Sequence, residues 1–208
     1  MAQPSATNPG APAPRHLHDH ALDNLRYIRD AMSRAGSFTA VPGWGGVAMG
    51  ATALAAAAIA GPPDNSLRWI AVWFTEAAVA VAVALGAMTL KSRRACTPLW
   101  TSSSGAPAFR FALGYVPPLV AGMVLTPVFA MLDSTARLPG CWLLLYGTAA
   151  TTGGAYSVRV VPIMGMTFMA LGTAAFAAPA EWGHYFMAAG FGGLHIVFGF
   201  IIARNYGG

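Results

Sequence analysis

Residues 69–90 read WIAVWFTEAAVAVAVALGAMTL and contain a single charged residue, Glu76. A helix formed by this stretch would rise roughly 33 Å at 1.5 Å per residue. That length is enough to cross the ~30 Å hydrocarbon core of a bilayer. The stretch therefore predicts a membrane-spanning helix.

The rest of the chain has the same character. Of its 208 residues, 56% are hydrophobic and 9% are charged, whereas soluble domains carry about 25% charged residues. The net charge of +5 does not indicate a nucleic-acid partner, because the cations lie in short segments between apolar runs. We therefore expect an integral membrane protein that contacts the lipid bilayer and binds no nucleic acid.

Six apolar runs are each close to the ~20 residues that a membrane-spanning helix needs. They are Thr39–Gly61, Trp69–Leu90, Phe111–Leu132, Leu138–Tyr156, Val160–Ala178 and His184–Ala203. The fourth and fifth are short and rich in small or polar residues, so a hairpin of two half-spans is the alternative there. The predicted fold is an all-α, polytopic six-transmembrane-helix bundle preceded by a cytoplasmic amphipathic helix.

Lysine and arginine set the orientation, because cytoplasmic loops of membrane proteins are enriched in them. With the N-terminus inside, only Arg68 and Arg137 fall outside. The inner segments hold Arg15, Arg26, Arg29, Arg34, Lys91, Arg93, Arg94, Arg110, Arg159 and Arg204. We therefore predict a multi-pass protein of the bacterial inner membrane with both termini cytoplasmic. The predicted outer ends carry aromatic residues typical of an interfacial belt, namely Trp69, Trp142, Trp182 and Tyr185.

Three regions are predicted along the chain: a disordered tail at 1–18, an amphipathic interfacial helix at 19–38 and the transmembrane domain at 39–208. Leu22, Leu25, Ile28 and Met32 recur at helical spacing in the second region, as expected for one apolar face. The candidate contacts to a partner or to anionic lipid are Arg26, Arg29, Arg34, Lys91, Arg93 and Arg94.

Two features bear on how the spans pack. Gly46 and Gly50 form a small-residue pair that allows close helix approach, either within one subunit or in a homo-oligomer. The third run contains Pro117, Pro118 and Pro127, and each proline frees a backbone carbonyl that a neighbour must satisfy. We therefore expect the third span inside the bundle.

Glu76, His184 and His195 form the candidate intramembrane polar site. An ionised carboxylate within a span is costly, so Glu76 is interpreted either as a proton or cation site or as a neutral or paired carboxyl that locks helices together. His184 is its expected partner. His195 is expected to hydrogen-bond a neighbouring helix, with a haem- or quinone-binding site as the alternative.

No catalytic residue, metal site or cofactor is expected. Haem ligation by two histidines would need a second histidine at the depth of His195, and the others are His16, His18, His20 and His184. The first three, with Asp19, are interpreted as part of a solvated tail. No serine nucleophile is placed to be activated by His195.

Two stretches resemble an uncharacterised group of small bacterial six-span inner-membrane proteins. They are Leu25–Arg29 with Ser37–Gly46, and Gly193–Gly199 with Arg204–Gly208. The resemblance covers only the two ends of the chain and implies no activity.

The predicted function is a non-enzymatic membrane subunit or regulator, acting through helix packing and through partners that include membrane or cytoplasmic proteins or a second copy. One alternative is a small oligomeric channel or an ion- or proton-coupled transporter using Glu76. Another is a haem- or quinone-binding redox subunit near His195.

Overall fold

The computed structural model describes residues 22–28, 38–63, 67–94 and 107–206. The chain divides into two units, Met1–Gly36 and Ser37–Gly208. In the first unit, residues 22–28 are helical and exposed, and they belong to the predicted amphipathic helix. The predicted tail at 1–18, with its three histidines, and the candidate contacts Arg29 and Arg34 lie outside the described residues.

All regular elements of the second unit that the structure describes are helices. They are α2 (Gly43–Ala60), α3 (Leu67–Arg94), α4 (Pro107–Met131), α5 (Leu138–Gly154), α6 (Val160–Ala177), α7 (Gly183–Met187) and α8 (His195–Tyr206). Short turns at Thr135–Arg137 and Ala180–Trp182 precede α5 and α7, and the π-helical segment Ala188–Leu194 joins α7 to α8.

Five helices are long and apolar enough to cross a membrane: α2, α3, α4, α6 and the continuous stretch Ala180–Tyr206. This finding supports the prediction of a multi-pass, all-helical membrane protein. The fourth predicted span corresponds to α5, which has 17 residues and is not among these five.

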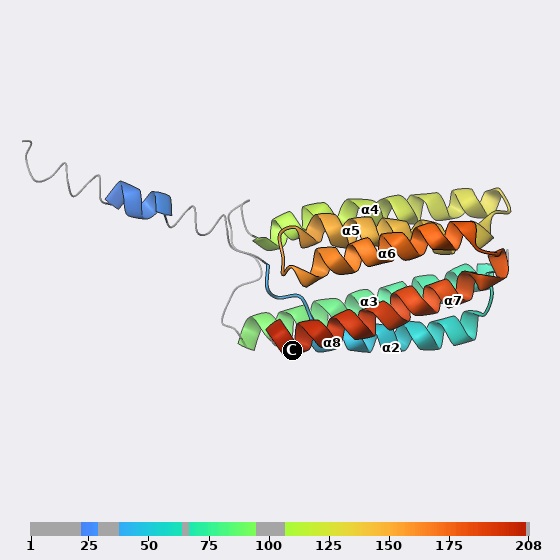
Figure 1. Ribbon diagram of the computed structural model, residues 1–208, viewed down its shortest axis with the longest axis horizontal. Coiled ribbons are helices and arrows are strands. Elements are labelled where there is room, and N and C mark those ends of the chain that lie inside the picture. The colour runs from blue at the N-terminus through green and yellow to red at the C-terminus, as the bar shows by residue number, and fades with distance from the viewer. Residues whose placement is uncertain (1–21, 29–37, 64–66, 95–106, 207–208) are drawn as a thin grey trace, which may run out of the picture. The chain divides into compact units, whose positions relative to one another are not determined.

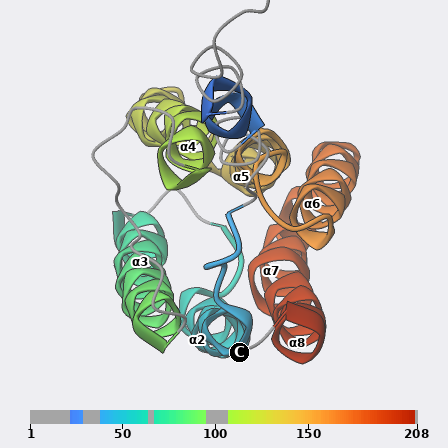
Figure 2. The ribbon, with the colours of Figure 1, turned by 90° about the vertical axis from the view of Figure 1, so that its left-hand side faces the viewer.

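Seen from one end, the helices form a ring in which α2 lies between α3 and α8, and α5 lies between α4 and α6 (Figure 2). Successive long helices run in opposite directions, and α7 and α8 continue in the same direction (Figure 1). Burial is uneven around the ring. Ten of the 17 residues of α5 are buried, against three of the 28 residues of α3.

Glycines set the closest helix contacts. A Cβ atom at Gly50 of α2 would lie 2.6 Å from the carbonyl oxygen of Gly192, and one at Gly147 of α5 would lie 2.6 Å from that of Gly165 in α6. Gly46 likewise faces the backbone of Gly199 in α8. The predicted glycine pair of the first span therefore packs within the chain.

The expectation that the proline-rich third span lies inside the bundle is wrong. Among the residues of α4, only Ala108, Gly122 and Thr126 are buried, and the helix packs chiefly against α5. Helix α5 compensates for one of the three prolines. Pro118 frees the carbonyl of Gly114, and the Thr152 hydroxyl donates a hydrogen bond to that oxygen at 2.6 Å.

The segment before α2 forms hydrogen bonds to the loop between α5 and α6. The backbone N–H of Phe38 donates to the carbonyl of Tyr156 at 2.7 Å, and the Ser157 hydroxyl donates to the carbonyl of Phe38 at 2.6 Å. The Phe38 ring is buried against Phe111 of α4, with ring centroids 4.9 Å apart. The chain thus crosses this end of the ring before it enters α2 (Figure 2).

Candidate functional site

Glu76 projects from α3 toward α2. Its side chain is half-buried, and Oε1 lies 2.8 Å from the hydroxyl oxygen of Thr52. The expected pairing with His184 is not made, since Nδ1 of His184 lies 2.7 Å from the carbonyl of Glu181 in its own turn. The reason is positional: α3 packs along α2, whereas His184 lies in α7 beyond them.

The surroundings of Glu76 hold no compensating charge. Helix α2 contains no ionisable residue, and the nearest cations of α3 are occupied elsewhere. Arg68 donates to the carbonyl of Ile59 at 3.0 Å, and Lys91 donates to the carbonyl of Val41 at 3.1 Å. In the part of the chain that the structure describes, Glu76 therefore has a hydroxyl as its partner and forms no ion pair.

His195 lies at the centre of the bundle and is 6% exposed. Its Nε2 atom is 2.6 Å from the Tyr146 hydroxyl of α5. The ring also packs against Phe168 of α6, with centroids 5.4 Å apart, and stacks near Phe191. This contact is the one expected from the hydrogen-bonding interpretation of His195.

The backbone on the N-terminal side of His195 is irregular. Residues Ala188–Leu194 form a π-helical segment, and such segments in other proteins often occur at functional sites. Nδ1 of His195 is buried and has no side-chain hydrogen-bonding partner among the described residues. The same holds for Nε1 of Trp73, whose ring packs against Phe191 at 6.2 Å.

An aromatic cluster joins the two sides of the ring. Its members are Trp69, Trp73, Trp142, Tyr146, Phe168 and Phe191. Trp69 is 1% exposed and stacks on Trp142 with centroids 5.4 Å apart. These two tryptophans therefore belong to the core rather than to the predicted interfacial belt. The other two predicted belt residues, Trp182 and Tyr185, are exposed.

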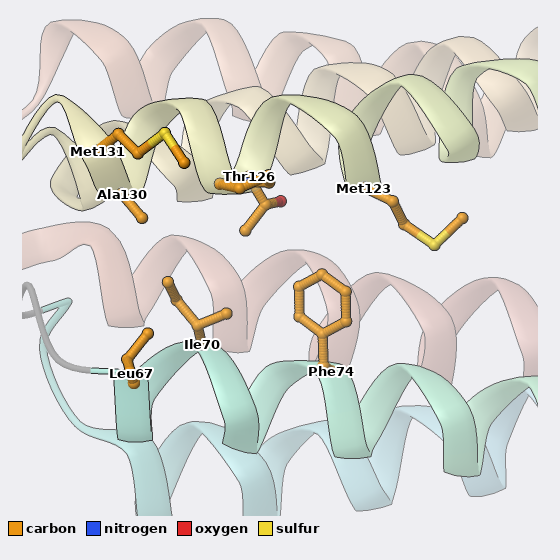
Figure 3. Close-up of a pocket in the computed structure, with 8 residues that line it drawn as sticks. Leu67, Ile70, Phe74, Met123, Thr126, Ala130 and Met131 are labelled. Atoms are coloured by element: carbon orange, nitrogen blue, oxygen red, sulfur yellow. The ribbon is translucent and has the colours of Figure 1, made fainter.

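An apolar groove of about 580 Å³ lies between α3 and α4 (Figure 3). Side chains of the two helices face each other across it, namely Leu67, Ile70 and Phe74 from α3 and Met123, Thr126, Pro127, Ala130 and Met131 from α4. The Thr126 hydroxyl donates a hydrogen bond to the carbonyl of Gly122 and accepts one from the indole N–H of Trp142. The groove therefore offers an apolar surface and no reactive group.

The outer face of α3 is lined by small residues. Ala71, Thr75, Ala78, Ala82 and Gly86 recur at three- and four-residue steps, and all five are exposed. A Cβ atom added at Gly86 would meet nothing within 4 Å. This small-residue stripe of α3 therefore leaves room for a further helix.

The basic candidates that the structure describes are at the surface, except Lys91. Arg26 forms an exposed ion pair with Asp23 at 3.4 Å, and Arg93 and Arg94 are exposed at the end of α3. These side chains remain available to a partner or to anionic lipid.

Three of the residues that matter here were missed from the sequence: Thr52, Trp73 and Tyr146. None of the three stands out within an apolar run, so only the helix arrangement reveals what each side chain contacts. Chemically, the Glu76–Thr52 pair can hold a proton, and the Tyr146–His195 pair can lock α5 to α8. Comparisons with protein-family models, with curated proteins and with solved structures gave no match.

Proposed function

We propose that the chain spans a bacterial inner membrane six times, with both termini cytoplasmic. The starts of α3 and α5 lie at the same end of the bundle (Figure 1), and these starts contain Arg68 and Arg137. The other end carries Lys91, Arg93, Arg94, Arg110, Arg159 and Arg204. The turn Thr135–Arg137 continues directly into α5, and together they rise roughly 30 Å at 1.5 Å per residue, which supports a sixth crossing.

The topology is tested by cysteine labelling in intact cells, in a background without Cys96 and Cys141. A membrane-impermeant maleimide should label Ser134→Cys from outside. It should label Tyr156→Cys only after the cells are permeabilised. Labelling of Tyr156→Cys from outside would contradict a complete crossing by α5.

The proposed role is that of a non-enzymatic membrane subunit or regulator that acts through helix packing. The observation that carries it is the small-residue stripe of α3. Each glycine of α2, α5 and α6 meets another helix or an adjoining segment of the chain, whereas Gly86 faces open space. Small-residue stripes in membrane helices mediate close helix association, so the stripe fits a neighbour from outside the chain.

A second copy of the chain is the neighbour that we propose. The stripe contains no charged residue, and a two-fold contact would pair it with itself. The adjacent groove is less suitable, because a helix fills on the order of 500 Å³ per turn at 10–12 Å across and 5.4 Å pitch. With about 580 Å³, the groove holds little more than one turn.

Cross-linking in native membranes tests this contact. Ala82→Cys, in the background without Cys96 and Cys141, should give a disulfide-linked dimer under mild oxidation. The matched control is Val124→Cys, an exposed position on α4, which should stay monomeric. Adding Gly86→Ile should abolish the Ala82→Cys dimer, and equal cross-linking at both positions would refute the interface.

The exposed arginines Arg26, Arg93 and Arg94 support a further contact with a cytoplasmic protein or with anionic lipid. Charge reversal at Arg93 and Arg94 should release such a partner from gently solubilised membranes. If no protein or lipid is lost on charge reversal, these residues serve only to orient the chain.

Proton- or ion-coupled transport is the second candidate function, favoured by the position of Glu76 within a span and by its single hydroxyl partner. Intramembrane carboxyls of this kind mark proton and ion pathways in transporters. Glu76→Gln should abolish coupled flux in liposomes while the protein stays folded. Unchanged flux would remove Glu76 from the pathway.

A further inference from the structure

The hydrogen bonds around Thr52 distinguish the two charge states of Glu76. The Thr52 hydroxyl has one hydrogen atom and three nearby acceptors, which are the carbonyl of Ala48 at 3.3 Å, the carbonyl of Met49 at 2.9 Å and Oε1 of Glu76 at 2.8 Å. If Glu76 is ionised, Thr52 must give its hydrogen to the carboxylate. If Glu76 is protonated, it donates to Thr52, and Thr52 donates to Met49, so that both short contacts are hydrogen bonds.

The surroundings favour the protonated form. Helix α2, against which the carboxyl packs, contributes no titratable or charged group. On α3 itself, Arg68 and Lys91 are more than two turns away and bond backbone carbonyls. A hydrogen bond from one hydroxyl stabilises a carboxylate by less than the free energy needed to move that carboxylate from water into hydrocarbon. The neutral carboxyl is therefore favoured.

The carboxyl is nevertheless not enclosed by protein. Glu76 is half-buried, in contrast to His195, which the core encloses. A helix interface that keeps a neutral carboxyl partly accessible can take up and release a proton without unfolding.

We propose that Glu76 is a reversible proton-binding site at the interface of α2 and α3, and that it carries its proton at neutral pH with Thr52 as its hydrogen-bonding partner. The site requires α3 to lie in the membrane. It does not depend on contact between two copies of α3, so failure of the cross-linking experiment would leave it intact.

Labelling with the apolar reagent dicyclohexylcarbodiimide tests the proposal. The reagent adds to a protonated carboxylic acid in the membrane and leaves a stable N-acylurea, which mass spectrometry locates. Membranes that contain the full chain are labelled across a series of pH values. Asp133 and Glu181 are the internal controls, since both are exposed in the short segments that join two helices.

At neutral pH we expect label on Glu76 and none on Asp133 or Glu181. Raising the pH should reduce labelling of Glu76 by about tenfold per unit once the carboxyl loses its proton. Label missing from Glu76 at every pH, acidic pH included, would overturn the proposal. So would labelling that does not change with pH, because the proton would then be permanently held.

Thr52→Val gives a second, independent readout. Removing the hydroxyl frees the Glu76 proton, so labelling at neutral pH should rise by about two- to tenfold, the equivalent of one hydrogen bond. Thr52→Ser restores the hydroxyl and should return the rate to that of the unmodified chain. Equal rates in all three proteins would show that Thr52 does not hold the proton.

Discussion

Tyr146→Phe removes one oxygen atom from the centre of the bundle and should destabilise the fold. The Tyr146 hydroxyl is the hydrogen-bonding partner of His195 Nε2 at 2.6 Å. Nδ1 of the same ring has no side-chain partner among the described residues. The substitution therefore leaves the imidazole with no side-chain hydrogen bond.

The magnitude follows from two opposing considerations. A buried polar group that loses its partner costs about 1–3 kcal/mol. Hydrogen bonds between membrane helices are worth less, about 0.6 kcal/mol on average and 1.7 kcal/mol at most in double-mutant cycles. Because the His195 ring is enclosed by Phe168 and Phe191, relaxation toward another partner is restricted. We expect a loss of about 1–2 kcal/mol.

The measurement is reversible unfolding in mixed micelles, arranged as a double-mutant cycle of Tyr146→Phe and His195→Phe. The matched control is Tyr185→Phe, because Tyr185 is 64% exposed and should change the free energy of unfolding by less than 0.5 kcal/mol or so. A coupling energy near zero, or an effect no larger than that of the control, would show that the contact does not hold α5 against α8. His195 would then need another explanation.

Three further tests, two of them with a matched control substitution, examine the packing. Gly50→Leu should prevent folding, or reduce stability by about 3 kcal/mol or more, since a side chain there would meet the backbone of Gly192. Gly86→Leu is the control and should leave the thermal stability of the detergent-solubilised monomer unchanged. Phe38→Ala should reduce stability by about 3 kcal/mol and increase hydrogen exchange in residues 155–158. Unchanged exchange there would show that Phe38 does not hold the segment before α2 against this loop. Thr152→Val should cost about 0.6 kcal/mol in the same unfolding assay, because a carbonyl freed by proline loses its donor, and Thr167→Val, whose hydroxyl serves only its own helix, should cost less.

Hydropathy and charge predicted much of the fold. The bounds of the second predicted span, Trp69–Leu90, lie within α3, and those of the fifth, Val160–Ala178, match α6 to one residue. This success has a physical basis, since lipid demands long apolar helices whatever their neighbours. Hydropathy does not, however, indicate which helices lie beside one another. The prolines of α4 and the ring of Trp69 were therefore placed wrongly, because their environment depends on which helices adjoin them.

Sequence reasoning singled out Glu76 and His195 but not the residues that contact them. Glu76 and His195 stand out in sequence because polar groups are rare in spans. Their partners, Thr52 and Tyr146, do not stand out, because threonine and tyrosine are tolerated in membrane helices without any special role. The choice of Thr52 over His184 required knowing that α2 lies beside α3, a long-range fact that periodicity does not contain.

The weak signal of the fourth predicted span has a structural cause. Helix α5 is the most enclosed helix of the ring, and a helix covered by protein need not be as apolar as one covered by lipid. Its hydroxyls satisfy backbone carbonyls: Thr148 and Thr151 bond their own helix, and Thr152 also serves the proline-interrupted α4. Its glycines allow α4 and α6 to approach on either side. The small and polar residues that lower its hydropathy are therefore the ones that a central helix needs, and low hydropathy in α5 is not an argument against a sixth crossing.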